Sequence, residues 1–155
     1  MNLLALLAEK KIVDASLRER VEAHAADRGI SYEKALLDEG VDGDAIRNAI
    51  GEYFDLPVRS ILANQRIDSD VLRYLSEESA RHYGIIPIAL EDDVLIVGIV
   101  DPENLAFRDA LNFITAKDQI PYKIVVILEH DFEHGLKSYE NLTGEVDEAL
   151  GVVET

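Results

Sequence analysis

The sequence predicts an α+β fold: a helical amino-terminal subdomain with repeated helical hairpins, followed by a small three-stranded sheet packed with helices. Two observations support this class. The first part of the chain, residues 1–57, contains a helical pattern that repeats at a fixed spacing. From Gly84 onward, short runs of β-branched and aliphatic residues alternate with turn and helix signals, which is typical of strands.

The amino-terminal helices form an internal repeat. Sliding residues 3–24 onto residues 32–53, an offset of 29 without a gap, places Leu7 on Leu36 and Leu17 on Ile46. Each copy predicts a short helix, a break and a longer helix whose apolar residues lie four apart and therefore share one face. Neither copy can bury its apolar stripe alone, so we expect the two copies to pack against each other.

Capping residues mark the ends of these helices. In the second copy Ser31 can cap the first helix, and Asp42 or Asp44 can cap the second. In the first copy Ser16 and Glu19 have the spacing of a capping box. These signals predict where three of the four helices begin.

The second part of the chain predicts a β-hairpin followed by a helix and a third strand. Residues 85–90 and 94–100 flank an acidic turn, and residues 121–128 form the third apolar run. Pro87 cannot donate a ladder hydrogen bond, so we expect the first strand at an edge of the sheet. The pair Asp101-Pro102 predicts a helix start between the second and third strands. A last helix is expected over about residues 131–141.

We expect three segments: a helical repeat subdomain at 1–57, a small α/β subdomain at 58–142 and an acidic flexible tail or linker at 143–155. Between residues 129 and 155 eight acidic residues stand against one base, Lys137. Such a run is typical of a solvated helix face and tail, and a docking surface for a basic partner is the alternative.

Composition limits the function. The formal net charge of −16 disfavours binding to nucleic acid and to anionic lipid. The chain has no cysteine, which excludes disulfides and thiolate chemistry. No apolar run approaches the ~20 residues of a spanning helix, so we expect no direct membrane insertion. These features favour a cytoplasmic protein.

Five motifs carry a family resemblance: DLPV at 55–58, IDSDVL at 67–72, YGIIPI at 83–88, VLIVGIVDPEN at 94–104 and DALNFIT at 109–115. In this order they resemble the N-terminal domain of type II secretion and type IV pilus assembly ATPases, over about residues 3–142. The resemblance implies an adaptor that docks the motor on the cytoplasmic part of an inner-membrane platform protein, and hence a cytoplasmic, membrane-peripheral location. It does not distinguish secretion from pilus systems.

Catalysis and cofactors are not expected in this chain. The phosphate-binding pattern Gly-x4-Gly-Lys-Ser/Thr of the family's motor domain does not occur in the sequence. His130, Glu133 and His134 match the H-x-x-E-H pattern of inverted zinc peptidases, and a small metallohydrolase is the enzyme alternative. A zinc site needs a third protein ligand, so we interpret both histidines as solvent-facing residues of an acidic helix.

The resemblance also raises a second function, a regulatory domain that senses cyclic dinucleotides. Members that bind cyclic di-GMP have Arg-Leu-Gly at the start of each helical unit and glutamine at its end. Here all six key positions differ, and they hold Asn2 and Ser31 for arginine, Leu4 and Glu33 for glycine, and His24 and Tyr53 for glutamine. We therefore predict that cyclic di-GMP does not bind.

The partner surface is predicted on the first helical unit. Its candidate contact residues are all apolar, namely Leu3, Leu6, Leu7, Leu17 and Val21. Apolar residues left over after intramolecular packing would form an interface. The alternative, that all five belong to the core, remains open at this point.

Overall fold

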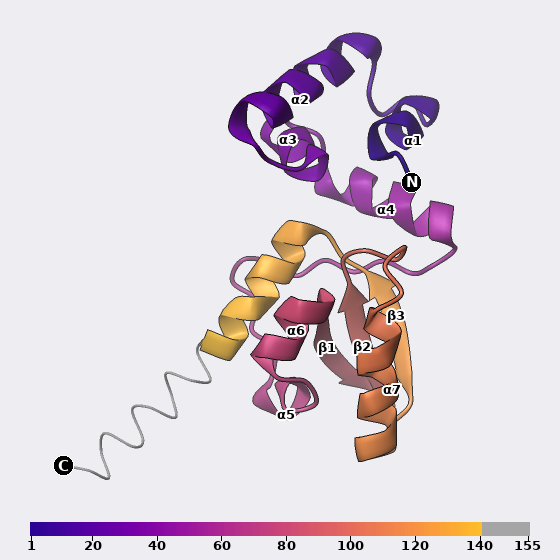
Figure 1. Ribbon diagram of the computed structural model, residues 1–155, viewed down its shortest axis with the longest axis vertical. Coiled ribbons are helices and arrows are strands. Elements are labelled where there is room, and N and C mark those ends of the chain that lie inside the picture. The colour runs from indigo at the N-terminus through magenta and orange to yellow at the C-terminus, as the bar shows by residue number, and fades with distance from the viewer. Residues whose placement is uncertain (141–155) are drawn as a thin grey trace, which may run out of the picture.

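The computed structural model describes residues 1–140, so the predicted tail at 143–155 lies outside the described residues. Four helices build its amino-terminal part: α1 (Leu3–Glu9), α2 (Ala15–Arg28), α3 (Tyr32–Asp38) and α4 (Gly43–Phe54). α1 and α3 begin and end 29 residues apart, which confirms the predicted repeat. Figure 1 shows these helices, coloured indigo to magenta, gathered at one end of the molecule.

The start of each copy is capped in the same way. The Asn2 side chain accepts a hydrogen bond from the Ala5 amide at 3.1 Å, and the Ser31 hydroxyl accepts one from the Lys34 amide at 3.1 Å. Asp42 caps α4 as predicted, by accepting from the Asp44 amide.

The predicted capping box of α2 is wrong. Asp14 is the N-cap and accepts from the Leu17 amide at 2.7 Å, whereas Ser16 lies inside the helix and accepts from Arg20. The helix begins at Ala15, so its exposed amide groups are within reach of Asp14 and not of Ser16.

The break inside each copy also repeats. The Ile12 amide donates to the Leu7 carbonyl at 2.9 Å, and the Val41 amide donates to the Leu36 carbonyl at 3.0 Å. One residue earlier the chain turns through the left-handed region, at Lys11 (φ 62°) in the first copy and at Gly40 (φ 90°) in the second. Glycine adopts this conformation without the steric cost that a side chain adds.

Lys11→Gly is therefore expected to stabilise the protein by about 0.5–1 kcal/mol, because it removes the left-handed strain of a lysine. Gly40→Lys introduces the same strain in the other copy and should lose a similar amount. Urea unfolding of both variants measures the two changes. If both substitutions changed the free energy of unfolding in the same direction, the two positions would not be equivalent.

The sheet contains β1 (Ile85–Glu91), β2 (Val94–Ile99) and β3 (Tyr122–Val126) in the order β1-β2-β3. β1 and β2 are antiparallel, and β2 and β3 are parallel. Asp92 and Asp93 form the hairpin turn with φ of 54° and 63°, as a two-residue turn between right-twisted strands requires. β1 is an edge strand as predicted, and its register shifts between Pro87 and Ala89.

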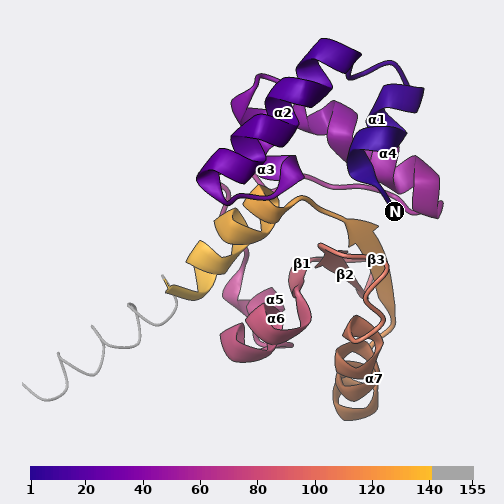
Figure 2. The same cartoon turned by 45° about the horizontal axis from the view of Figure 1, so that its top comes forward.

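The remaining helices are α5 (Ser69–Leu72), α6 (Glu77–Tyr83), α7 (Phe107–Asp118) and a final helix over residues 129–140. Both views place α5, α6 and α7 at the opposite end of the molecule from α1–α4 (Figure 2). Among residues 1–140, no helix has the length and apolar character needed to cross a membrane.

The predicted helix start at Asp101-Pro102 is wrong, because α7 begins at Phe107. The Asp101 side chain accepts from the Glu103 amide at 3.1 Å, and its carbonyl accepts from the Asn104 amide at 3.2 Å. Asp101 therefore stabilises a turn over residues 101–104 instead of capping a helix.

Two hydrophobic clusters divide the core. One surrounds the sheet, and the other lies between α1, α2, α3 and α4 and also takes in Val126 and Leu128. The Val126 amide donates to the Pro57 carbonyl at 2.8 Å, and its carbonyl accepts from the Arg59 amide at 3.0 Å. The end of β3 thus connects the helical part to the sheet.

Candidate functional site

A buried ion pair joins the helical part to the final helix. Arg47 on α4 is 4% exposed and Asp131 is fully buried. The guanidinium donates from Nε to Oδ2 at 2.9 Å and from Nη2 to Oδ1 at 3.1 Å, a two-point contact. The same carboxylate accepts from the amides of Ile61 (3.0 Å) and Leu128 (2.8 Å). Asp131 therefore fixes three segments of the chain in one place.

A second polar contact joins α3 to the start of the final helix. The Glu129 amide donates to Oε1 of Glu33 at 2.6 Å, and the Ser31 hydroxyl donates to the Glu129 carboxylate at 2.9 Å. Burial raises the pKa of Glu33 to about 7, and the charges of Glu129 and Asp131 act in the same direction. The Glu129 amide and the Arg47 charge oppose this increase in pKa.

The raised pKa makes stability depend on pH. Between the unfolded value of 4.5 and the folded value of about 7, the folded protein binds more protons at Glu33 than the unfolded chain. The free energy of unfolding therefore falls as the pH rises from 5 to 8. Glu33→Gln should remove the contribution of Glu33 to this decrease in the free energy of unfolding, which is on the order of 2 kcal/mol. Urea unfolding at pH 5 and at pH 8 measures it. Glu19→Gln, an exposed control on α2, should keep it; an unchanged slope in Glu33→Gln would contradict the burial of a titrating carboxyl.

The two histidines do not face solvent as predicted, because both are half-buried. His134 donates from Nδ1 to the Ile61 carbonyl at 2.6 Å. The His130 ring stands edge-on to the His134 ring, and the two ring centroids are 5.4 Å apart. Nδ1 of His130 is buried and has no hydrogen-bond partner among the described residues. Within residues 1–140, no group of three or more acidic or histidine side chains could hold a metal ion. The pair instead packs at the junction between the two halves.

Five of the six positions that correspond to the cyclic dinucleotide motif make contacts within the fold. Leu4 is 2% exposed and belongs to the helical core, and Glu33 is held by the final helix. Asn2 and Ser31 cap α1 and α3. His24 contacts Asp38 through Nε2 at 3.0 Å.

Tyr53, the sixth of these positions, is 56% exposed at the end of α4. Its ring stands edge-on to Phe54, with the centroids 4.9 Å apart. His24 and Tyr53 are equivalent positions of the repeat, but their surroundings differ: His24 is half-buried and contacts Asp38 on α3, whereas Tyr53 lies on the surface.

The predicted partner residues divide into two groups. Leu7 and Val21 are completely buried in the helical core, so they offer no surface to a partner in this fold. Leu3, Leu6 and Leu17 are half-buried and pack against the edge of the same core. Only these three retain surface that a partner could cover.

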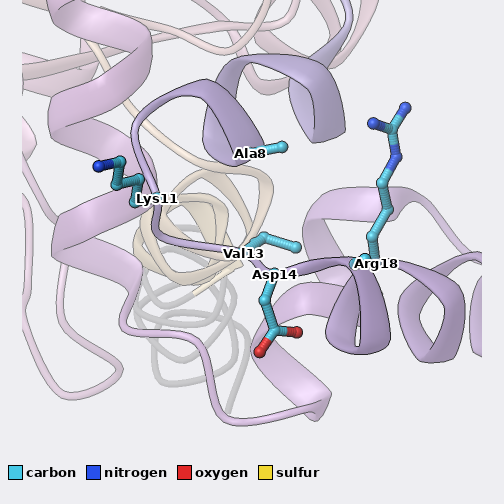
Figure 3. A pocket seen from close by; sticks show the side chains of 6 residues that line it. Ala8, Lys11, Val13, Asp14 and Arg18 are labelled. Carbon is cyan, nitrogen blue, oxygen red and sulfur yellow. The ribbon is translucent and has the colours of Figure 1, made fainter.

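A groove of about 390 Å³ lies at the break between α1 and α2. Its walls are short apolar side chains with charged residues around them: Ala8, Val13, Ala15, Lys11, Asp14 and Arg18. Figure 3 shows Lys11 and Arg18 on opposite sides, with Ala8 and Val13 between them. The sequence analysis did not predict this groove. One signal for it was present, because the offset of 29 that aligns Leu7 with Leu36 also aligns Arg18 with Arg47.

Comparison with protein families identifies the fold. The MshEN domain matches residues 54–146, which is more than half of the chain. The chain belongs to the MshEN domain family. The family resemblance inferred from the motifs is thus confirmed at the level of this domain.

Solved structures share the architecture of this MshEN domain. The structure of MshE with cdg has a TM-score of 0.59 and 24% sequence identity, and the match covers 90% of this chain and 99% of that one. The N-terminal domain of XpsE has a TM-score of 0.51 and 16% identity, with 88% and 92% covered. At these identities the likeness concerns the fold alone.

Two curated relatives place a similar segment in much longer proteins. Bacteriophage adsorption protein B of Escherichia coli K12 is 28% identical over 143 residues, and bacteriophage N4 adsorption protein B of Escherichia coli O157:H7 has the same identity. The match covers 86% of this MshEN domain but only 17% of each relative.

Proposed function

We propose that this MshEN domain is a protein-interaction domain that docks a type II secretion or type IV pilus assembly ATPase on the cytoplasmic part of an inner-membrane platform protein. The observation that carries the proposal is the placement of the first helical unit. α1 and α2 pack on α3 and α4 at the end of the molecule away from α5–α7, and half-buried Leu3, Leu6 and Leu17 lie there (Figures 1 and 2). The shared fold with the N-terminal domain of XpsE also supports this role.

The curated relatives indicate a second kind of host protein. The curated relatives are named for bacteriophage adsorption, and the domain makes up a small share of their length. An adaptor role fits either host, because in both cases the domain occurs within a larger protein. Hydrolysis of ATP would belong to another part of such a host.

Calorimetry with the cytoplasmic part of a platform protein tests the docking role. We expect the domain to bind, and Leu3→Asp together with Leu6→Asp to abolish binding, because two charges would then face an apolar contact. Ala5→Asp, at an exposed position of α1, serves as the matched control and should bind normally. Leu7→Asp is the core reference and should lower the melting temperature much more than the Leu3/Leu6 variant.

If the domain binds no platform protein from its own organism, the docking proposal fails. If the Leu3/Leu6 variant unfolds as readily as Leu7→Asp, these residues belong to the core and the partner surface lies elsewhere.

A cyclic dinucleotide sensor is the second candidate function, favoured by the fold shared with the structure of MshE with cdg. The side chains argue against it. Leu4 fills the first glycine position with a core residue, and Glu33 would place a carboxylate against an anionic ligand. Ser31 and Asn2 cannot pair with phosphate as arginine does.

We therefore expect titration of cyclic di-GMP into the domain to give no binding heat. Isothermal calorimetry measures this directly, because it detects binding with a Kd in the micromolar range. Micromolar binding would establish the sensor function and remove the argument from the six altered positions.

A further inference from the structure

In the second copy of the repeat, the start of the final helix packs against α4. A Cβ atom added to Gly43 would lie 3.5 Å from Cε1 of His130, 3.6 Å from Cδ2 of Leu37 and 3.6 Å from Nη2 of Arg47. Arg47 in turn binds the Asp131 carboxylate at two points. The start of the final helix, residues 129–140, thus lies against Gly43 and Arg47 of the second copy, and its Asp131 binds the arginine. Leu37 of the same copy lies beside Gly43.

The first copy has the same three positions at an offset of 29. Leu37, Gly43 and Arg47 correspond to Ala8, Asp14 and Arg18, and all three of these line the groove of about 390 Å³. The side chain of Arg18 is 38% exposed, whereas that of Arg47 is 4% exposed. Arg18 pairs through Nε with Glu22 at 3.1 Å, on the surface of α2. The described residues therefore cover the arginine of one copy and leave that of the other at the surface.

We propose that the groove of the first copy binds the start of a helix of a partner protein, whose aspartate or glutamate pairs with Arg18 as Asp131 pairs with Arg47. This inference rests on the docking function proposed above and names its contact site. The second copy is occupied by a helix of the chain itself, and the first copy receives the equivalent element from the partner.

The charges around the groove favour an acidic segment. Lys11 and Arg18 stand on opposite sides, and the one acidic residue of the lining, Asp14, already accepts from the Leu17 amide as the cap of α2. Ala8 stands where the second copy has a leucine, so this wall leaves more room for an incoming side chain. A second copy of this chain is a poorer occupant, because Asp131 is already buried and two chains of net charge −16 repel each other.

The experiment uses a synthetic peptide with the sequence of residues 127–140 as the probe, because it carries the acidic helix start that the second copy binds. Titrated into the isotopically labelled full chain, it should shift the amide resonances of Ala8, Val13, Ala15 and Arg18. Arg18→Ala should reduce the affinity about fivefold, as expected for a partly exposed ion pair. A peptide with Asp131→Asn should lose a similar factor against the unchanged protein.

Arg20→Ala is the matched control, since Arg20 lies on the same helix and pairs with Ser16 and Glu39 outside the groove. It should bind the peptide like the unchanged chain. Three results would overturn the proposal: no shifts around the groove, shifts confined to the surroundings of Gly43 and Arg47, or equal binding by the Arg18 and Arg20 variants.

The chain's own residues 141–155 are the remaining occupant to distinguish. If Arg18→Ala alone, without peptide, shifts the amides of residues 141–155, that segment takes the groove and a partner does not. The groove proposal and the docking proposal can fail separately. If Arg18→Ala binds a platform protein as well as the unchanged domain does, the domain docks by another surface. If the unchanged domain binds no platform protein, the docking function itself is wrong.

Discussion

Asp131→Ala is expected to lower the free energy of unfolding by about 3–5 kcal/mol, because the buried Arg47 guanidinium then keeps only its contact with the exposed Asp44 carboxylate, at 2.6 Å. The loss extends beyond the ion pair. The amides of Ile61 and Leu128 also donate to this carboxylate, and alanine leaves both without that acceptor. Urea unfolding followed by far-ultraviolet circular dichroism measures the change.

The control for this prediction lies two residues further along the same helix. Glu133 is exposed, so Glu133→Ala should change stability by less than about 0.5 kcal/mol. A double variant, Arg47→Met with Asp131→Ala, should recover part of the loss, since it removes the buried charge that has lost its buried counter-ion. A loss below about 1 kcal/mol in Asp131→Ala would mean that the junction is open to water in solution.

The second large effect is expected at Gly51, in the interior of α4. Replacing a helix-interior glycine with alanine ordinarily stabilises a protein by about 0.5–1 kcal/mol. Here a Cβ would lie 2.3 Å from Cγ1 of Val58 and 2.8 Å from the Leu56 carbonyl oxygen. The backbone oxygen cannot move aside as a flexible side chain can, so Gly51→Ala should destabilise by about 1–3 kcal/mol.

Gly43 provides the matched control at the other end of α4. The nearest atom to its added Cβ lies at 3.5 Å, which is ordinary van der Waals contact. Gly43→Ala should therefore leave stability unchanged or raise it slightly. Thermal unfolding of both variants, followed by circular dichroism, decides the sign; stabilisation by Gly51→Ala would show that the connector after α4 does not pack as described.

Much of the fold could be predicted from local patterns. The repeat follows from a gapless offset that places Leu7 on Leu36, and both residues are completely buried. The hairpin follows from two aliphatic runs around Asp92 and Asp93. In each case the signal lies within a short stretch of sequence, where apolar spacing or turn chemistry determines the structure.

Helix starts were less predictable because several residues can serve the same role. Asp14 and Ser16 are both good N-caps, and the side chain at Asp14 takes this position. Asp101-Pro102 has the chemistry of a helix start, but its side chain closes a turn and α7 begins five residues after Pro102. The choice depends on where the helix packs, which local sequence does not specify.

The junction could not be predicted from sequence because its partners are distant along the chain. Arg47 and Asp131 are 84 residues apart, and charged residues are usually exposed, so neither is an obvious core residue. The histidine motif suggested a metal or a solvated helix, whereas His130 and His134 lie at this junction. The final helix carries Asp131 and both histidines, and it packs against the second copy of the repeat through Arg47 on α4.

The central claim is that a partner binds the first helical unit and that the chain's own final helix occupies the second. Hydrogen–deuterium exchange of the domain, alone and with the cytoplasmic part of its platform protein, tests this claim most directly. We expect protection to increase in residues 3–18 on complex formation and to stay unchanged in α7 and β1. Protection confined to the sheet and α7, or increased exchange of the final helix on binding, would contradict it.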